Sequence, residues 1–140
     1  MLKRIATASI ILTLVAAGAA FAATQTGTKV TLHSTNKGKV LATSAGRTLY
    51  LYTPDGHNKS NCYGSCLTYW PPLMTTAKPV AGTGVHQALL GTTKRTNGKL
   101  QVTYNGHPLY RYTGDSAAGQ AYGEGYGGTW YVVTAAGNKK

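Results

Sequence analysis

The sequence predicts a mainly β protein made of two tandem, pseudo-symmetric repeats. Three observations predict it: a motif recurs after sixty residues, short runs rich in Val, Leu, Thr and Tyr alternate with Gly, Asn and Pro, and no long segment beyond residue 22 has helical periodicity. We expect an antiparallel meander that forms a small sandwich or barrel-like domain. At most a short helical turn is expected near Cys62–Tyr69, because Pro71 and Pro72 would end it.

The recurring motif is ten residues long and needs no gap. The first copy begins at Gly46 and reads GRTLYLYTPD, and the second begins at Gly106 and reads GHPLYRYTGD. Both tryptophans of the chain also occupy one repeat position. The repeat-motif residues are Tyr50, Tyr52, Asp55, Trp70, Tyr110, Tyr112, Asp115 and Trp130.

The match extends upstream of the motif in the same register, where Thr43 aligns with Thr103. We therefore expect repeat 1 at about residues 38–70 and repeat 2 at about residues 98–130. Two copies of one supersecondary unit would then pack as a single domain.

Turn residues divide the chain into short strands. Asn97-Gly98 and Asn105-Gly106 are strong hairpin signals, and the segment 44–46 occupies the place of the second one in repeat 1. The expected strands are residues 29–33, 40–43, 48–53, 89–94, 100–104, 109–113 and 129–134.

The first residues have the pattern of a secretory signal peptide. Lys3 and Arg4 precede an apolar stretch that is short for a membrane span, and Ala20-Phe21-Ala22 matches an A-x-A cleavage site. We expect cleavage before Ala23, which gives a signal peptide at residues 1–22 and one mature domain at residues 23–140 without a transmembrane anchor. The protein is thus expected to be periplasmic or secreted.

The chain is strongly basic, with a formal net charge of +11. Without the signal peptide, twelve basic residues face three acidic ones, a net charge of +9. A basic exported protein favours contact with anionic envelope polymers or lipid headgroups, whereas its compartment argues against nucleic acid as a partner.

The tyrosines of each motif lie on one face of their strand. Because strand side chains alternate, Tyr50 and Tyr52 share a face, and so do Tyr110 and Tyr112. Such a stripe is interpreted as half-buried core with the phenol oxygens bonded at its edge. The alternative is a surface on which a sugar or another planar ligand stacks.

These motifs resemble a known family. The pattern Tyr-x-Tyr-x-x-Asp, present twice, is similar to the hallmark of the bacterial secreted-repeat family, predicted lipoproteins with a Tyr-x-(Phe/Trp/Tyr)-x-x-Asp motif. The resemblance also covers the two cysteines, Trp70-Pro71-Pro72, and residues 102–110 and 128–133. It implies a loose link to alkane utilisation that no residue here supports. Since this chain lacks a lipid-attachment cysteine near the predicted cleavage site, anchoring is not carried over.

The only cysteines are Cys62 and Cys66. Two cysteines in an exported protein most often form a disulfide, and Gly64 between them permits the turn that the bridge needs. The alternative is a copper or redox site, because thiolates at this spacing select soft metals. His57 is the nearest further ligand, and His86, His107 and Met74 are more distant candidates.

The two repeated aspartates, Asp55 and Asp115, follow a strand in a turn, where a carboxylate accepts backbone N–H groups. A carboxylate pair could also act as general acid and base of a hydrolase, but no nucleophile, metalloprotease or phosphate-binding motif accompanies it. We therefore expect a non-catalytic envelope binding or interaction protein of unknown ligand and without a cofactor. Copper binding is the alternative.

The signal-peptide prediction can be checked directly. N-terminal sequencing of the exported protein should begin at or near Ala23, because signal peptidase cuts after the small-residue site. Soluble exported protein that keeps Met1 would contradict it.

Overall fold

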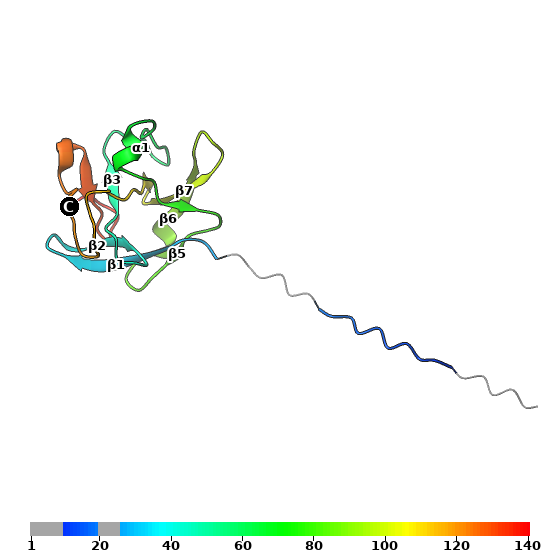
Figure 1. Ribbon diagram of the computed structural model, residues 1–140. Helices are drawn as coiled ribbons and strands as arrows, with labels where there is room; N and C mark the ends of the chain where they lie inside the picture. The colour runs from blue at the N-terminus through cyan, green and yellow to red at the C-terminus, as the bar shows by residue number, and fades with distance from the viewer. Residues whose placement is uncertain (1–9, 20–25) are drawn as a thin grey trace, which may run out of the picture.

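The computed structural model describes residues 10–19 and 26–140 (Figure 1). Residues 10–19 form no helix or strand, and the predicted cleavage site before Ala23 lies outside the described residues, so it stays a prediction. In the described part, no helix is long and apolar enough to cross a membrane. The elements are β1 (Lys29–Thr35), β2 (Gly38–Thr43), β3 (Tyr50–Tyr52), α1 (Cys66–Tyr69), β4 (Met74–Thr75), β5 (Val80–Ala81), η1 (Gln87–Leu89), β6 (Leu90–Lys94), β7 (Leu100–Tyr104), β8 (His107–Pro108), η2 (Tyr126–Gly128) and β9 (Trp130–Val132).

Each repeat opens with an antiparallel hairpin. Strands β1 and β2 pair from Val30↔Thr43 to Thr35↔Gly38, and β6 and β7 pair from Leu90↔Tyr104 to Lys94↔Leu100. The glycines Gly38 and Gly98 at the hairpin ends have positive φ angles of 89° and 81°. Glycine adopts this conformation without the steric cost that a side chain would add. The hairpins predicted at Asn97-Gly98 and Asn105-Gly106 are confirmed as the pairings of β6 with β7 and of β7 with β8.

The sequence alignment of the two repeats without a gap is wrong by one residue in the second strand of each hairpin, β2 and β7. The N–H of Leu41 donates to the carbonyl of Val133, and the N–H of Val102 donates to that of Leu73. The acceptors are sixty residues apart but the donors are sixty-one apart, so Thr43 does not correspond to residue 103. The turn after β6 is one residue longer than its counterpart and the turn after β7 is one residue shorter, which restores the register at the motif.

The two repeats exchange their last strands. Strand β9 of repeat 2 pairs with β3 of repeat 1, and β4 of repeat 1 pairs with β7 of repeat 2. The resulting sheets have the orders β2-β1-β5, β3-β9 and β4-β7-β6, with β8 on the side of β7. Only one pairing, β1 with β5, is parallel among the described strands. Mainly antiparallel β structure in two tandem repeats is confirmed, but the sheets do not close into a barrel.

The strand predicted at residues 109–113 is reduced to single bridges. Tyr110 bridges Pro72, in the register in which Tyr50 pairs with Val132 in the other repeat. Pro71 and Pro72 have no N–H to donate, so this ladder loses bonds that β3 and β9 make. The remaining bonds, such as the 2.9 Å bond from the N–H of Arg111 to the carbonyl of Pro71, keep the segment extended.

Two cores lie between these sheets. One is mainly aliphatic and includes Val30, Leu41, Leu49 and Val102. The other is mainly aromatic and holds the repeat motif. The expected helical turn is present as α1, and it leads directly into the aromatic core.

Candidate functional site

The repeated aromatic residues form one stack of four rings. Trp70 and Trp130 lie face to face, with ring centroids 3.9 Å apart and planes 2° apart. Tyr112 stacks on Trp70 at 4.4 Å, and Tyr52 stacks on Trp130 at 4.3 Å. Each tyrosine therefore covers the tryptophan of the other repeat. The tryptophans are only 4% and 5% exposed.

A second pair of tyrosines, Tyr50 and Tyr110, makes edge-to-face contacts with the two tryptophans of this stack. Tyr50 meets Trp70 at 5.3 Å and 78°, and Tyr110 meets Trp130 at 5.1 Å and 89°, both edge-to-face geometries that aromatic pairs prefer. Tyr50 and Tyr110 are fully buried. For these rings, the interpretation of the stripe as core is confirmed, and they present no face to a ligand.

The phenol groups of these buried tyrosines reach across to the other repeat. The hydroxyl of Tyr50 donates to Oδ2 of Asp115 at 2.5 Å, and that of Tyr110 donates to Oδ2 of Asp55 at 2.8 Å. The backbones of Tyr50 and Tyr110 also exchange two N–H···O bonds, of 2.8 and 3.0 Å. The motif thus joins the repeats reciprocally, a connection that its sequence does not reveal.

The aspartates also accept backbone N–H groups, as predicted. Oδ1 of Asp55 accepts the N–H of Asn61 at 2.7 Å, and Oδ1 of Asp115 accepts that of Tyr122 at 2.9 Å. Burial raises the pKa of both carboxyl groups, and these hydrogen bonds oppose the rise. Each carboxylate is therefore committed to holding the fold.

The cysteines form the predicted disulfide, with Cα atoms 5.5 Å apart. Gly64 has a φ angle of 61°, which supplies the turn between Cys62 and Cys66 that a regular helix would lack. While this bond is intact, neither sulfur is a thiolate that could bind copper. The third candidate ligand, His57, is exposed, and the described residues contain no group of three or more His, Cys, Asp or Glu placed to hold a metal.

Arg95 is buried against the disulfide loop. It is 5% exposed, and its guanidinium donates to Oγ of Ser60 at 2.8 Å, to Oε1 of Gln101 at 2.6 Å and to the carbonyl of Cys62 at 2.6 Å. The guanidinium also lies over the ring of Tyr63 at 4.2 Å. These contacts satisfy a buried charge and fasten the loop to repeat 2.

A basic surface groove is a feature that the sequence did not show. One hollow of about 520 Å³ contains Lys99, Thr28 and Met74, and a second of about 540 Å³ shares Thr28 and Met74 and adds Arg47 and Arg111. A third, of about 230 Å³, shares the two arginines and continues to Tyr112 and Thr113. We name the joined hollows the basic groove; its defining residues are Lys99, Met74, Thr28, Arg47, Arg111 and Tyr112.

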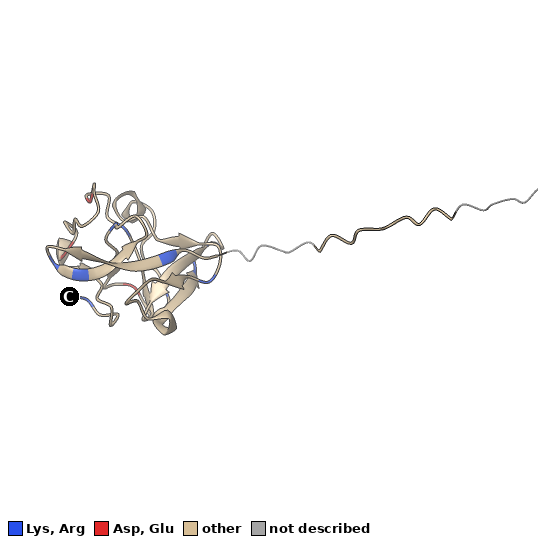
Figure 2. Cartoon of the chain, turned by 90° about the horizontal axis from the view of Figure 1, so that it is seen from below, with Lys and Arg blue, Asp and Glu red and all other residues tan. Residues whose placement is uncertain are grey.

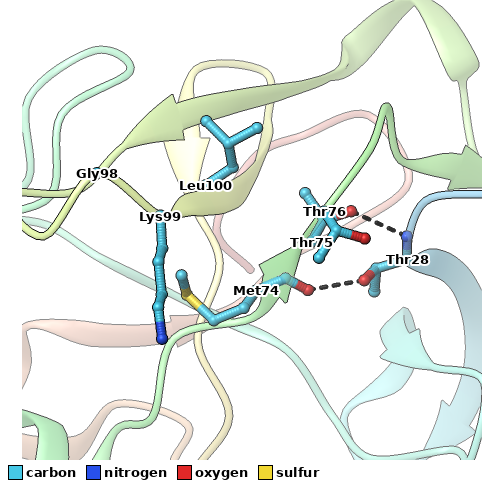
Figure 3. Close-up of a pocket in the computed structure, with 7 residues that line it drawn as sticks. All are labelled: Thr28, Met74, Thr75, Thr76, Gly98, Lys99 and Leu100. Carbon is cyan, nitrogen blue, oxygen red and sulfur yellow. Dashed lines mark hydrogen bonds between the residues drawn. The ribbon is translucent and has the colours of Figure 1, made fainter.

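The groove combines cations with hydroxyl groups. Figure 3 shows Lys99 and Met74 at one side of the first hollow and Thr28 at the other, where the Thr28 hydroxyl donates to the Met74 carbonyl at 2.7 Å. In the third hollow, Nη1 of Arg47 donates to the Asp115 carbonyl at 2.9 Å, which orients the guanidinium. Lys99 and Arg111 are exposed. Only the fold brings Arg47 into the same hollows as Arg111, because the two residues are 64 positions apart in sequence.

The acidic residues offset only part of this charge, through Asp115, which lines the third hollow and interacts with Arg47. The chain has three acidic residues, and besides the two aspartates the third, Glu124, accepts the N–H of Val132 at 2.6 Å. All three carboxylates thus bond within the fold. Figure 2 accordingly shows Lys and Arg at several places on the domain and few acidic positions.

The fold and these contacts define a class: a two-repeat β protein whose halves exchange strands and share one aromatic core. Residues 31–74 and 91–134 each match the family described as "Secreted repeat of unknown function". Together the two matches cover more than half of the chain, so the protein belongs to this secreted family, and the resemblance seen in the motif is confirmed. Searches of curated proteins and of solved structures each found no significant match.

The reciprocal tyrosine–aspartate bonds predict cross-repeat coupling. In a double-mutant cycle on the free energy of unfolding, Tyr50→Phe and Asp115→Ala should couple by about 0.5–3 kcal/mol, because the two side chains share a buried bond. Urea unfolding of the four proteins measures this. The control cycle combines Tyr50→Phe with Asp55→Ala, from the same motif copy, and should couple less. Equal coupling in both cycles would contradict the exchanged pairing.

The buried phenols predict a loss of stability at alkaline pH. Burial raises the pKa of Tyr50 and, likewise, of Tyr110 above the usual value of about 10. Their contribution to the free energy of unfolding is therefore complete below about pH 10 and is lost as the pH rises further, because only the unfolded chain releases these protons. In that range, each buried phenol makes the free energy of unfolding fall by up to about 1.4 kcal/mol per pH unit.

Urea unfolding between about pH 9 and pH 11, followed by tryptophan fluorescence, measures this slope. Tyr50→Phe should reduce the slope whatever its effect on absolute stability. The control is Tyr69→Phe, at a ring that is 62% exposed, which should keep the parent slope. A Tyr50→Phe slope equal to that of the parent would count against the assignment.

Proposed function

We propose that this protein is an exported, non-catalytic protein that binds an anionic polysaccharide of the cell envelope along the basic groove. The observation that supports it is the grouping of Lys99, Arg47 and Arg111 along three hollows that share lining residues. One carboxylate, that of Asp115, lines these hollows against the three cations. A guanidinium binds the carboxylate of a sugar acid through paired hydrogen bonds, and a lysine adds a point charge.

The shape and lining of the groove favour a polymer over a lipid headgroup. Three hollows that share residues offer contacts to several successive sugar units, whereas a headgroup would occupy one of them. Hydroxyls such as that of Thr113 can bond sugar hydroxyls, and the half-buried ring of Tyr112 offers an edge for a sugar to pack on. The net charge of the mature chain, +9 if cleavage follows Ala22, would attract either partner from a distance.

Binding to polygalacturonate, measured by titration calorimetry, tests the proposal. We expect affinity that falls steeply with added salt, since exposed charges are screened within about 10 Å at 0.1 M. Lys99→Gln/Arg111→Gln should weaken binding by about tenfold, equivalent to roughly 1.4 kcal/mol. Neither side chain has an essential contact in the core, so the variant should fold.

The matched control is Lys37→Gln/Lys39→Gln, which removes the same charge from the β1–β2 hairpin, away from the groove residues. Equal weakening by both variants would show diffuse attraction and contradict a groove site. Neutral dextran should not bind. Tighter binding to phosphatidylglycerol vesicles than to polygalacturonate would favour a lipid partner instead.

The alternative from the sequence, a periplasmic copper or redox protein, depends on free thiolates at Cys62 and Cys66. Their disulfide would have to be reduced before a metal could bind. Stoichiometric copper bound by the reduced protein, and lost in Cys62→Ser/Cys66→Ser, would support this alternative.

A further inference from the structure

A second pocket is related to one end of the basic groove by the repeat. It has a volume of about 300 Å³, and its lining residues include Leu51, Tyr52, Thr53, Asp55, His107 and Lys139. We name it the His107 pocket. Five of these positions are sixty residues from positions that line the third hollow of the groove: Arg111, Tyr112, Thr113, Asp115 and Arg47. The fold has therefore built the same hollow twice.

The parts common to both hollows are a tyrosine, a threonine and an aspartate. Tyr52 and Tyr112 are the outer rings of the four-ring stack, so one hollow lies at each end of the aromatic core. The Oδ2 atom of each aspartate accepts a hydrogen bond from a buried phenol of the other repeat. This bond holds the carboxylate in the wall of the hollow.

The cations differ between the two hollows. His107 stands where the groove has Arg47, and Leu51 stands where it has Arg111. The C-terminal segment supplies a replacement, because Lys139 lines the His107 pocket with its Nζ 4.5 Å from the centre of the Tyr131 ring. Burial and the neighbouring His57 lower the pKa of His107, so its imidazole is neutral at pH 7 and offers one hydrogen bond in place of a charge.

We propose that the His107 pocket is a second, weaker binding site for the same anionic polysaccharide, so that one protein molecule holds two polymer strands. This inference rests on the proposed function of the basic groove. Lys139 would pair with a sugar carboxylate, Thr53 would bond a sugar hydroxyl, and Tyr52 would contact the ring. Two sites at opposite ends of a rigid core make the protein a cross-linker and raise its avidity for a polymer mesh.

The stoichiometry of a short oligomer tests the inference. Hexagalacturonate should bind the parent at two sites, the second about tenfold weaker because it has fewer cations. Lys99→Gln/Arg111→Gln should lose the tight site and Lys139→Gln/His107→Gln the weak one, each keeping the other. Amide chemical shifts in the first variant should then move at Tyr52 and Thr53 and not at Lys99. Circular dichroism checks that each variant folds.

Each outcome decides between the two proposals. Parent protein that binds one hexamer, lost in Lys99→Gln/Arg111→Gln, would keep the groove and overturn the second site. Two hexamers retained by Lys139→Gln/His107→Gln would place both in the groove and likewise overturn it. Parent protein that binds no hexamer would overturn the groove as well. With polygalacturonate, light scattering should rise for the parent and remain low for both variants.

Discussion

The face-to-face contact between Trp70 and Trp130 is the interaction on which the rest of the structure depends. It lies where the two repeats meet, and every other motif contact is arranged about it in pairs. Burying two tryptophans against each other removes a large apolar area from water, at a point where the strands β3, β4 and β9 are only two or three residues long. Short strands with few ladder bonds can persist because this core holds them together.

The tyrosine–aspartate motif has a physical reason at this centre. A buried phenol needs a hydrogen-bond partner, and a carboxylate at the end of a strand needs donors. The reciprocal placement satisfies both requirements at once, and it does so only when two copies face each other. The motif therefore serves to pack the two repeats together. The residues between its fixed positions can differ in charge, as Leu51 and Arg111 do at equivalent positions of the two repeats.

Much of this fold could be predicted from the sequence, because its strong signals are local. Asn-Gly turns, alternation in strands and the spacing of Cys62 and Cys66 each specify a nearby contact. The exchange of strands, the burial of Arg95 and the one-residue shift in β7 could not be predicted, since each depends on contacts between distant segments. The groove was missed for the same reason: its cations are brought together by tertiary structure alone.

The exchanged strands bear on the ancestry of the chain. A lone repeat would leave its tryptophan uncovered and its phenol without a carboxylate, yet a second identical copy would supply both through a two-fold axis. The geometry is the one that a symmetric homodimer would have if its two subunits were joined in one chain. The segment between β4 and β6 is the tether, and it replaces a concentration-dependent assembly with folding within one chain. Within one chain the two halves are free to differ: the disulfide belongs to repeat 1, and each repeat contributes one arginine to the groove.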